Sequence, residues 1–285
     1  MASGSYGWSL KLLCAALPLV LGCAPLELRS AAKTPLTQPR LSPGTVVLDI
    51  YFIRFPFAEA DANGPPWDEI DEQRFPPELR QRLADNGFRV GVVGGHVPDR
   101  LAKLMEIQET AAGPPEAAAV TFAAQPKVVV RHLQAGAGAR EEIVSHQVET
   151  MTPLLVGADC ELQGQTFPKG QGVFALRTQP QPDGAVRLEL TPEVQYGEPK
   201  VDYVVGGAGA AEFRLEAGRP KEVFDSMKLE ASLGPGEMLV LTSLPERSAS
   251  LAHHFFVETA NGATEQKLLI IRVAQTQHDP LFGSE

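Results

Sequence analysis

The chain has 285 residues, of which 44% are hydrophobic, so it is long enough to bury one large core or two small ones. Its formal net charge is −10 and its 25 basic residues are scattered along the sequence, which excludes the basic surface that a nucleic-acid-binding protein needs. The 26 glycines and 24 prolines, with only 7% aromatic residues, favour a β-rich fold of short elements joined by turns.

The first 22 residues have the pattern of a signal peptide. Lys11 precedes an apolar run, 12–21, that is short for a membrane-spanning helix, and the run ends in Leu-Val-Leu-Gly-Cys at residues 19–23. This ending resembles the lipobox of bacterial lipoproteins, in which a small residue precedes the cysteine that receives the lipid. The resemblance implies a signal peptide at 1–22, a mature chain that begins at Cys23, and lipid attachment at Cys23. A plain secretory signal cleaved beside this cysteine, or an uncleaved anchor, is the alternative.

The residues after Cys23 suggest where the anchored protein resides. In the sorting rule of bacterial lipoproteins, Ala24 rather than Asp after the lipidated cysteine implies the outer membrane, facing the periplasm. Residues 23–44 are rich in proline and small residues, so we expect a tether. After processing, Cys160 is the one remaining thiol, which excludes a disulfide within a mature chain, and we expect it to be buried and inert.

Residues 45–110 are predicted to form a small α/β subdomain. A β-branched and aromatic strand at 46–54 is followed by a short helix at 66–72 and a second helix that begins at Pro77. A strand at 88–93 and a helix at 98–108 complete a β-α-α-β-α unit. The Ala- and Pro-rich segment 111–124 is predicted to be a connector.

Residues 125–276 are predicted to form a mainly antiparallel β domain, followed by a short tail at 277–285. Turns such as Asp183-Gly184 and Asn261-Gly262 between apolar runs indicate hairpins. The predicted fold class is therefore α+β. The expected strands are 126–134, 140–149, 159–166, 171–180, 185–195, 200–206, 210–216, 222–233, 236–244, 252–260 and 265–276.

Four phrases in this β region resemble the C-terminal β domain of secretins, the ring-forming proteins of type II and type III secretion. They are the Asp-Gly turn at 183–184, L-x-L-x-P-E at 188–193, G-x-x-L-V-L at 236–241 and L-I-I-x-V at 269–273. The phrases that precede the gate in secretins and their repeated N-domains have no counterpart here, so the resemblance implies a reduced secretin-like domain. An unrelated β domain is the alternative. In general style the chain is also similar to lipoproteins of planctomycetes.

No pattern in the sequence specifies a catalytic, cofactor or metal site. The glycine-rich stretch 207–212 has Glu212 where a dinucleotide fingerprint needs glycine, so it reads as a loop. In an acidic segment, Asp61, Asn63 and Glu72 fall at calcium-loop spacing, but prolines occupy the other ligand and turn positions, so we expect a solvated loop.

The six histidines do not show metal-ligand spacing. His253 and His254 are expected on opposite faces of one strand, while His96, His132, His146 and His278 are far apart in sequence. We therefore expect no cofactor and no metal.

The sequence as a whole favours a non-enzymatic lipoprotein of the cell envelope. It would attach to the membrane through its lipid and act by contacts with envelope proteins, through the sheet edges of the β domain. A homo-oligomer is compatible with this prediction. A hydrolase of envelope polymers or a small-ligand-binding module is the alternative.

Overall fold

The computed structural model describes residues 44–57, 64–106, 127–157, 161–205, 213–260 and 262–276. The predicted signal peptide, Cys23, the tether up to residue 43, the connector and the tail lie outside them. The helical elements are η2 (Pro65–Glu69), η3 (Glu72–Arg74), α2 (Pro77–Asp85), α3 (Asp99–Glu106), η4 (Asp225–Met227) and α4 (Leu251–Phe256). The strands are β1 (Thr45–Pro56), β2 (Phe88–Val93), β3 (Val128–Gly136), β4 (Arg140–Gln147), β5 (Thr150–Met151), β6 (Leu154–Val156), β7 (Leu162–Gly164), β8 (Phe167–Pro168), β9 (Gln171–Pro180), β10 (Val186–Gln195), β11 (Lys200–Val205), β12 (Phe213–Gly218), β13 (Lys221–Val223), β14 (Leu229–Leu233), β15 (Met238–Ser243), β16 (Val257–Ala260) and β17 (Ala263–Thr276).

The fold is mainly antiparallel β, with few helices. A larger sheet has the strand order β2-β15-β17-β1-β3, and β16 also pairs with β17. A smaller sheet has the order β13-β10-β9-β4, and β14 pairs with β10 beside β13. Three two-stranded ribbons complete the described strands: β5 with β8, β6 with β7, and β11 with β12.

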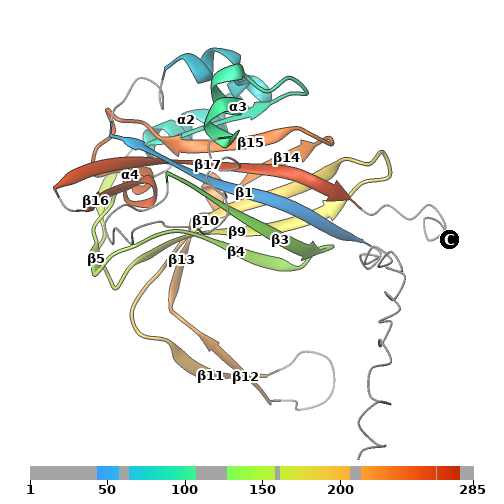
Figure 1. Cartoon of the computed structure of the whole chain (residues 1–285). Helices are drawn as coiled ribbons and strands as arrows, with labels where there is room; N and C mark the ends of the chain where they lie inside the picture. Colours follow the sequence, from blue (N-terminus) through green and yellow to red (C-terminus); the bar gives the residue numbers. More distant parts are fainter. Residues whose placement is uncertain are drawn as a thin grey trace, which may run out of the picture. The chain divides into compact units, whose positions relative to one another are not determined.

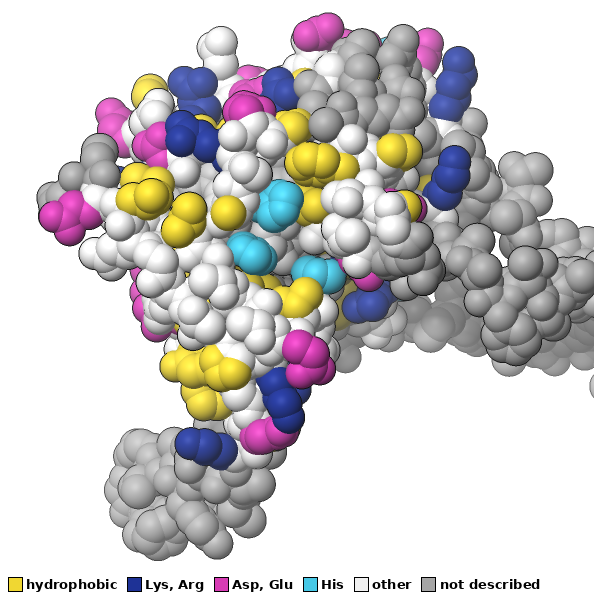
Figure 2. Space-filling model, turned by 90° about the vertical axis from the view of Figure 1, so that its left-hand side faces the viewer, with side chains coloured by type: hydrophobic (Ala, Val, Ile, Leu, Met, Phe, Trp, Pro, Cys, Tyr) yellow, Lys and Arg dark blue, Asp and Glu magenta, His cyan; other side chains and the backbone are white. Residues whose placement is uncertain are grey.

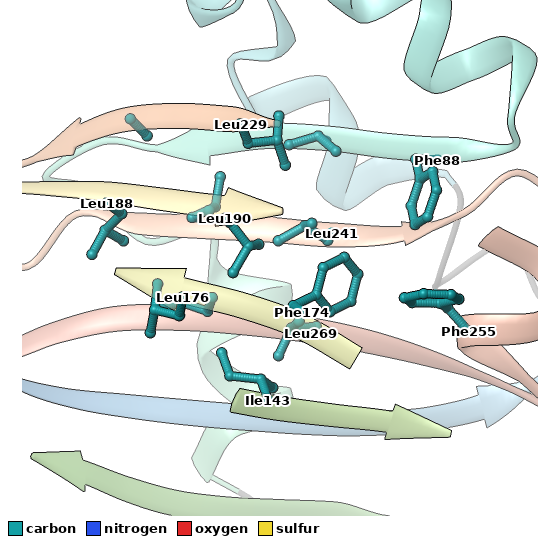
Figure 3. Close-up of a cluster of buried hydrophobic side chains, with 14 of the residues drawn as sticks. Phe88, Ile143, Phe174, Leu176, Leu188, Leu190, Leu229, Leu241, Phe255 and Leu269 are labelled. Carbon is teal, nitrogen blue, oxygen red and sulfur yellow. The ribbon is translucent and has the colours of Figure 1, made fainter. Parts of the chain in front are cut away.

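The main core lies between the inner faces of the two sheets (Figure 3). Ile50 and Phe52 of β1 and Leu269 and Ile271 of β17 face it from the larger sheet, because alternate residues of a strand point to the same side. The smaller sheet contributes side chains such as Phe174 of β9. The short helix α4 closes one end of this core with Phe255 and Phe256. Phe174 packs edge-on against Phe255, with ring centroids 5.2 Å apart.

The outer face of the larger sheet is covered by helical segments (Figure 1). Trp67 of η2 and Leu101 of α3 are buried in a second apolar cluster with Tyr51 and Ile53 of β1 and Ile270 of β17. The central strands are therefore apolar on both faces, which explains the near-continuous apolar runs at 46–53 and 268–271.

The expected division into a subdomain at 45–110 and a β domain at 125–276 needs correction. β1 hydrogen-bonds to β3 on one side and β17 on the other, and β2 hydrogen-bonds to β15, so both segments build one sheet. All the described residues belong to one compact unit. A strand like β1, apolar on both faces, needs neighbours at both edges and a layer on each side, which a subdomain of that size does not supply.

Most predicted elements occur close to their expected limits, including the strands 88–93 and 171–180 and the helices at 77 and 98. Two strands were wrong in part. Segment 222–233 is interrupted by η4, and the first half of segment 252–260 is the helix α4. Leu251, Ala252, Phe255 and Phe256 are buried, a spacing that suits one face of a helix rather than a strand. The short helix expected at 66–72 is the 3-10 helix η2, with η3 beginning at Glu72.

Candidate functional site

β3 is the last strand of the larger sheet at one end and has one free edge. It pairs with β1 along nine residues, from Thr45 opposite Gly136 to Ile53 opposite Val128, and with no other described strand. Figure 1 shows β3 beside β1 at the end of the sheet. A free edge of this length presents a row of backbone donors and acceptors that another strand can use.

The opposite end of the same sheet is protected. Asp71, between η2 and η3, donates its N–H to the carbonyl of Val92 at 2.9 Å and accepts from the N–H of Val92 at 3.0 Å. This bridge occupies the outer edge of β2 at Val92. Covering an edge in this way prevents unwanted strand addition, and β3 has no equivalent cover among the described residues.

The register between β1 and β3 shows which backbone N–H groups of β3 point away from the sheet. Arg54 donates its N–H to the carbonyl of Lys127 at 2.7 Å, and their pairing continues the β1–β3 ladder. Hydrogen-bonded and non-hydrogen-bonded residue pairs alternate along an antiparallel ladder. The backbone N–H groups of Arg131 and Leu133 therefore donate to β1. The N–H groups of Val130, His132 and Gln134 therefore point away from the sheet.

The free edge also has a distinct charge. From Lys127 to Arg140 the sequence contains no acidic residue, in a protein whose net charge is −10. The side chains of Lys127, Arg131, His132 and Gln134 are exposed. Basic residues on an edge repel a second copy of the same edge and attract an acidic segment.

A cavity of about 90 Å³ lies beside this edge, between the inner faces of the two sheets. β3 supplies Val129 and Arg131 to its wall, and β4, the end strand of the smaller sheet, supplies Val144 and Ser145. The other lining residues are Phe52 and Arg54 of β1 and Lys267 of β17. Three cationic side chains thus line a small space without an acid among them.

Lys267 is the most deeply buried of these cations. Its ammonium group lies 3.0 Å from Glu258 Oε2, donates to the carbonyl oxygen of Ser145 at 3.2 Å, and lies 3.5 Å from Nδ1 of His146. These contacts use all three donors of an ammonium group. Glu258 also faces Arg54, whose Nη1 is 3.4 Å from its carboxylate.

Burial sets the protonation of this cluster. Burial and the charge of Lys267 lower the pKa of His146 to about 4, so this imidazole is neutral at pH 7 and can accept from Lys267. Burial lowers the pKa of Lys267, while the carboxylate of Glu258 acts against that change. Burial would raise the pKa of Glu258, but its ion pairs with Lys267 and Arg54 outweigh that effect and lower it.

The histidine pair that the sequence placed on a strand lies on α4 instead. Ser250 caps the helix by accepting from the N–H of His253 at 3.2 Å. The rings of His253 and His254 are 6.0 Å apart and nearly perpendicular, and burial lowers the pKa of both. Figure 2 shows histidine side chains gathered on one face of the molecule.

The remaining candidate residues do not converge on one site. His132 lies on β3, with Nδ1 2.7 Å from the buried carboxylate of Asp49, and Glu72 forms an ion pair of 2.6 Å with Arg89. Within the described ranges no group of three His, Cys, Asp or Glu side chains is arranged to hold a metal ion. Cys23, Cys160, Asp61, Asn63, His278 and the stretch 207–212 lie outside those ranges.

A larger hollow, of about 630 Å³, lies between α2 and β2. Leu83 and Phe88 provide apolar wall, while Arg80 and the ion-paired Glu72 and Arg89 provide charge. Its volume is in the range of sites that bind small organic molecules.

Sequence reasoning missed Arg54, Glu258 and Lys267. Lys267 directly precedes the apolar run 268–271, which was the available signal that a lysine lies in a buried strand. None of the helices in the described part of the chain is long and apolar enough to cross a membrane. Comparisons with protein-family models, with curated proteins and with solved structures find no match to this chain.

Proposed function

We propose that this protein is a non-enzymatic lipoprotein of the bacterial cell envelope that binds an extended segment of a partner protein at the free edge of β3. The observation that carries the proposal is the contrast between the two ends of one sheet. Asp71 bridges the edge of β2 at Val92, whereas the nine-residue edge of β3 has no such bridge among the described residues. Strand addition at such an edge is a common mode of peptide recognition.

The charge of the edge supports a partner segment that is acidic. Lys127 and Arg131 are exposed on or beside β3, and the sequence 127–140 holds no acid to neutralise them. Complementary charge chiefly raises the association rate and selects the partner. A second copy of this chain is one outcome of the test.

The test is a proline at an outward-facing amide. Gln134→Pro removes one donor from the free edge but leaves the bonds to β1, whereas Gln134→Ala removes the same side chain and keeps the donor. A photo-crosslinking residue at Gln134 should capture a protein in detergent-solubilised envelopes. The captured protein, once identified and purified, should bind the wild type and Gln134→Ala with equal affinity. It should bind Gln134→Pro more weakly. Equal binding by all three variants would overturn the β3 site.

Self-association is examined with the same variants. If the partner is a second copy of the chain, light scattering should give a dimer or larger assembly for wild type and Gln134→Ala, and a monomer for Gln134→Pro. A monomeric wild type that crosslinks to nothing would contradict both forms of the proposal.

The membrane part of the proposal rests on Cys23 and the lipobox-like residues 19–23. Cys23→Ser should release the protein from membranes and abolish labelling by radioactive palmitate. Cys160→Ser is the matched control and should change neither. Membrane association that persists without the thiol of Cys23 would remove the lipid anchor from the proposal. Outer-membrane residence, inferred from Ala24, is checked by fractionation.

Two further assignments belong to this proposal. We also propose that the fold class is α+β, which the packing of η2 and α3 on one face of an antiparallel sheet supports. The β region is a reduced relative of the secretin domain, which the phrases in β10, β15 and β17 support. A strand-by-strand comparison with a secretin barrel tests that ancestry.

A small-ligand-binding module is the second candidate function, and the hollow between α2 and β2 favours it. A thermal-shift screen of small molecules tests this candidate, because a ligand that binds only the native state raises the melting temperature. Ala84→Trp, in the wall of the hollow, should abolish any such shift.

A further inference from the structure

The cavity beside β3 combines small volume with an excess of positive charge. Its wall carries Arg54, Arg131 and Lys267, and no acidic residue lines it. Two carboxylates, Glu258 and Glu265, contact the cations from outside the cavity, at 3.0–3.6 Å from Lys267 or Arg54. Three positive charges therefore face two negative ones, and one positive charge has no local counterpart.

Arg54 carries a donor that the protein does not use. Its Nη1 reaches Glu258 and Glu265, but its Nε is buried and has no hydrogen-bond partner. Leaving a charged donor unpaired and out of water is costly, so native proteins almost always satisfy such an atom. An acceptor from outside the chain would remove this cost.

Arg131 is the second cation with unused capacity. Its guanidinium lies over the ring of Phe52, 5.9 Å from the centroid, and no described acid forms an ion pair with it. Guanidinium groups offer several donors in one plane and favour carboxylate and phosphate oxygens. Lys267 is different, because its donors already contact Glu258, Ser145 and His146, so it contributes charge rather than a free donor.

From these features we propose that the cavity lined by Arg54, Arg131 and Lys267 is a binding site for one small oxyanion, a carboxylate or a phosphate. The cavity of about 90 Å³ corresponds to roughly three water molecules at about 30 Å³ each. That space suits a single oxyanion group. The site is independent of strand addition at β3, although an acidic side chain of a docked segment would supply the same chemistry.

The test uses inorganic phosphate and acetate as probes on the full-length protein. Each is titrated at constant ionic strength against chloride, and binding is followed by the melting temperature and by calorimetry. We expect saturable stabilisation by at least one probe, because a ligand of the native state raises stability in proportion to its occupancy. Preference for phosphate indicates a free tetrahedral anion as the ligand, and preference for acetate indicates a carboxylate, whether free or on a peptide.

Arg131→Gln tests the site with little risk to folding, since Arg131 is exposed. Loss of one charge-assisted hydrogen bond should weaken binding about tenfold or more. Lys127→Gln is the matched control: it removes the same charge from an exposed position at the start of β3, outside the cavity wall, and should change the affinity less than about twofold. Arg54→Lys retains the charge but removes Nε, and should weaken binding as Arg131→Gln does.

Three results would overturn the site. They are no stabilisation by either probe beyond that of chloride, equal weakening by Lys127→Gln and Arg131→Gln, and unchanged affinity in Arg54→Lys. Because Gln134→Pro leaves the cavity wall intact, it should bind the probes as wild type does. Failure of strand addition and failure of the oxyanion site are therefore distinguishable.

Discussion

Arg140 of β4 reaches across β9 to Glu193 of β10 and donates two hydrogen bonds to its carboxylate, at 2.8 and 2.6 Å. Both strands pair with β9, so this contact ties together the two neighbours of the central strand. The Glu193 side chain is only 3% exposed, whereas that of Arg140 is 29% exposed. Glu193 is therefore a buried charge whose solvation is replaced mainly by one guanidinium.

We predict that Arg140→Ala is strongly destabilising, by about 3 kcal/mol, because it leaves the buried carboxylate of Glu193 with the more distant ammonium group of Lys221, 4.0 Å away, as its ion-pair partner. The matched control is Arg187→Ala, which removes an exposed partner of Glu230 and should cost about 0–1 kcal/mol. Urea unfolding of the two variants measures the difference. Equal losses of unfolding free energy in the two variants would mean that other groups or water stabilise the carboxylate of Glu193.

Gly87 offers a second comparison, with Gly184 as its control. Both have left-handed backbone angles, φ +81° and φ +84°, but a Cβ on Gly87 would lie 2.0 Å from Ser250 Oγ, and a Cβ on Gly184 would meet nothing within 4 Å. Gly184→Ala should cost about 1 kcal/mol from the backbone alone. Gly87→Ala should cost clearly more, by at least about 1 kcal/mol, because it also displaces the cap of α4. Thermal unfolding of the two variants separates the cost of backbone strain from the cost of the steric clash with Ser250.

Asn86 connects the end of α2 to β6. Its side-chain amide donates to the carbonyls of Arg82 at 3.0 Å and Val156 at 3.2 Å, and its Oδ1 accepts from the N–H of Val156 at 3.0 Å. Asn86→Ala should cost about 2–3 kcal/mol, because the N–H and the carbonyl of Val156 lose the side-chain amide that pairs with both of them.

Asn86→Asp should be worse than Asn86→Ala at neutral pH, since it places a carboxylate against two carbonyl oxygens. The exposed Gln81, which donates to Asp85 at 3.1 Å, provides the control: Gln81→Ala should cost a few tenths of a kcal/mol. A loss from Gln81→Ala as large as that from Asn86→Ala would contradict the special role of the buried amide.

His146 should make stability fall as the pH falls. Its pKa is about 4 in the folded protein and 6.5 in the reference state, so between these values the unfolded chain binds more protons. Stability therefore rises with pH through this window and is lost from about pH 6.5 down to about pH 4. After allowance for solvent screening at a partly exposed site, we expect the free energy of unfolding to fall by roughly 1–2 kcal/mol across this window.

The measurement is the free energy of unfolding at several pH values for wild type and His146→Gln. The groups that act on His146 are Lys267 of β17, Glu258 of β16, His254 of α4 and Arg54 of β1. His253 and His254 have lowered pKa values of their own, so His146→Gln should reduce the slope without abolishing it. An unchanged slope would show that His146 is not the main titrating group.

The sequence by itself determined local structure wherever a single period dominated. Alternating and continuous apolar runs predicted β2, β9 and β17, and Asp183-Gly184 predicted the hairpin of β9 and β10, because side-chain periodicity and the left-handed turn are local properties. The same signals misassigned 252–256, where a run of apolar residues beside two histidines is compatible with either a strand or a helix. Burial of Phe255 and Phe256 at the end of the core selected the helix.

Only the tertiary structure decided which strands are neighbours and which charges meet. β1 pairs with β17, more than 200 residues along the chain, and that pairing brings Arg54 close to Lys267, Glu258 and Glu265. The same topology leaves β3 at an edge and Asp71 on the opposite one. Contacts between distant segments depend on the packing of two-faced strands and not on local pattern, so neither the free edge nor the cationic cavity could be identified before the fold was known.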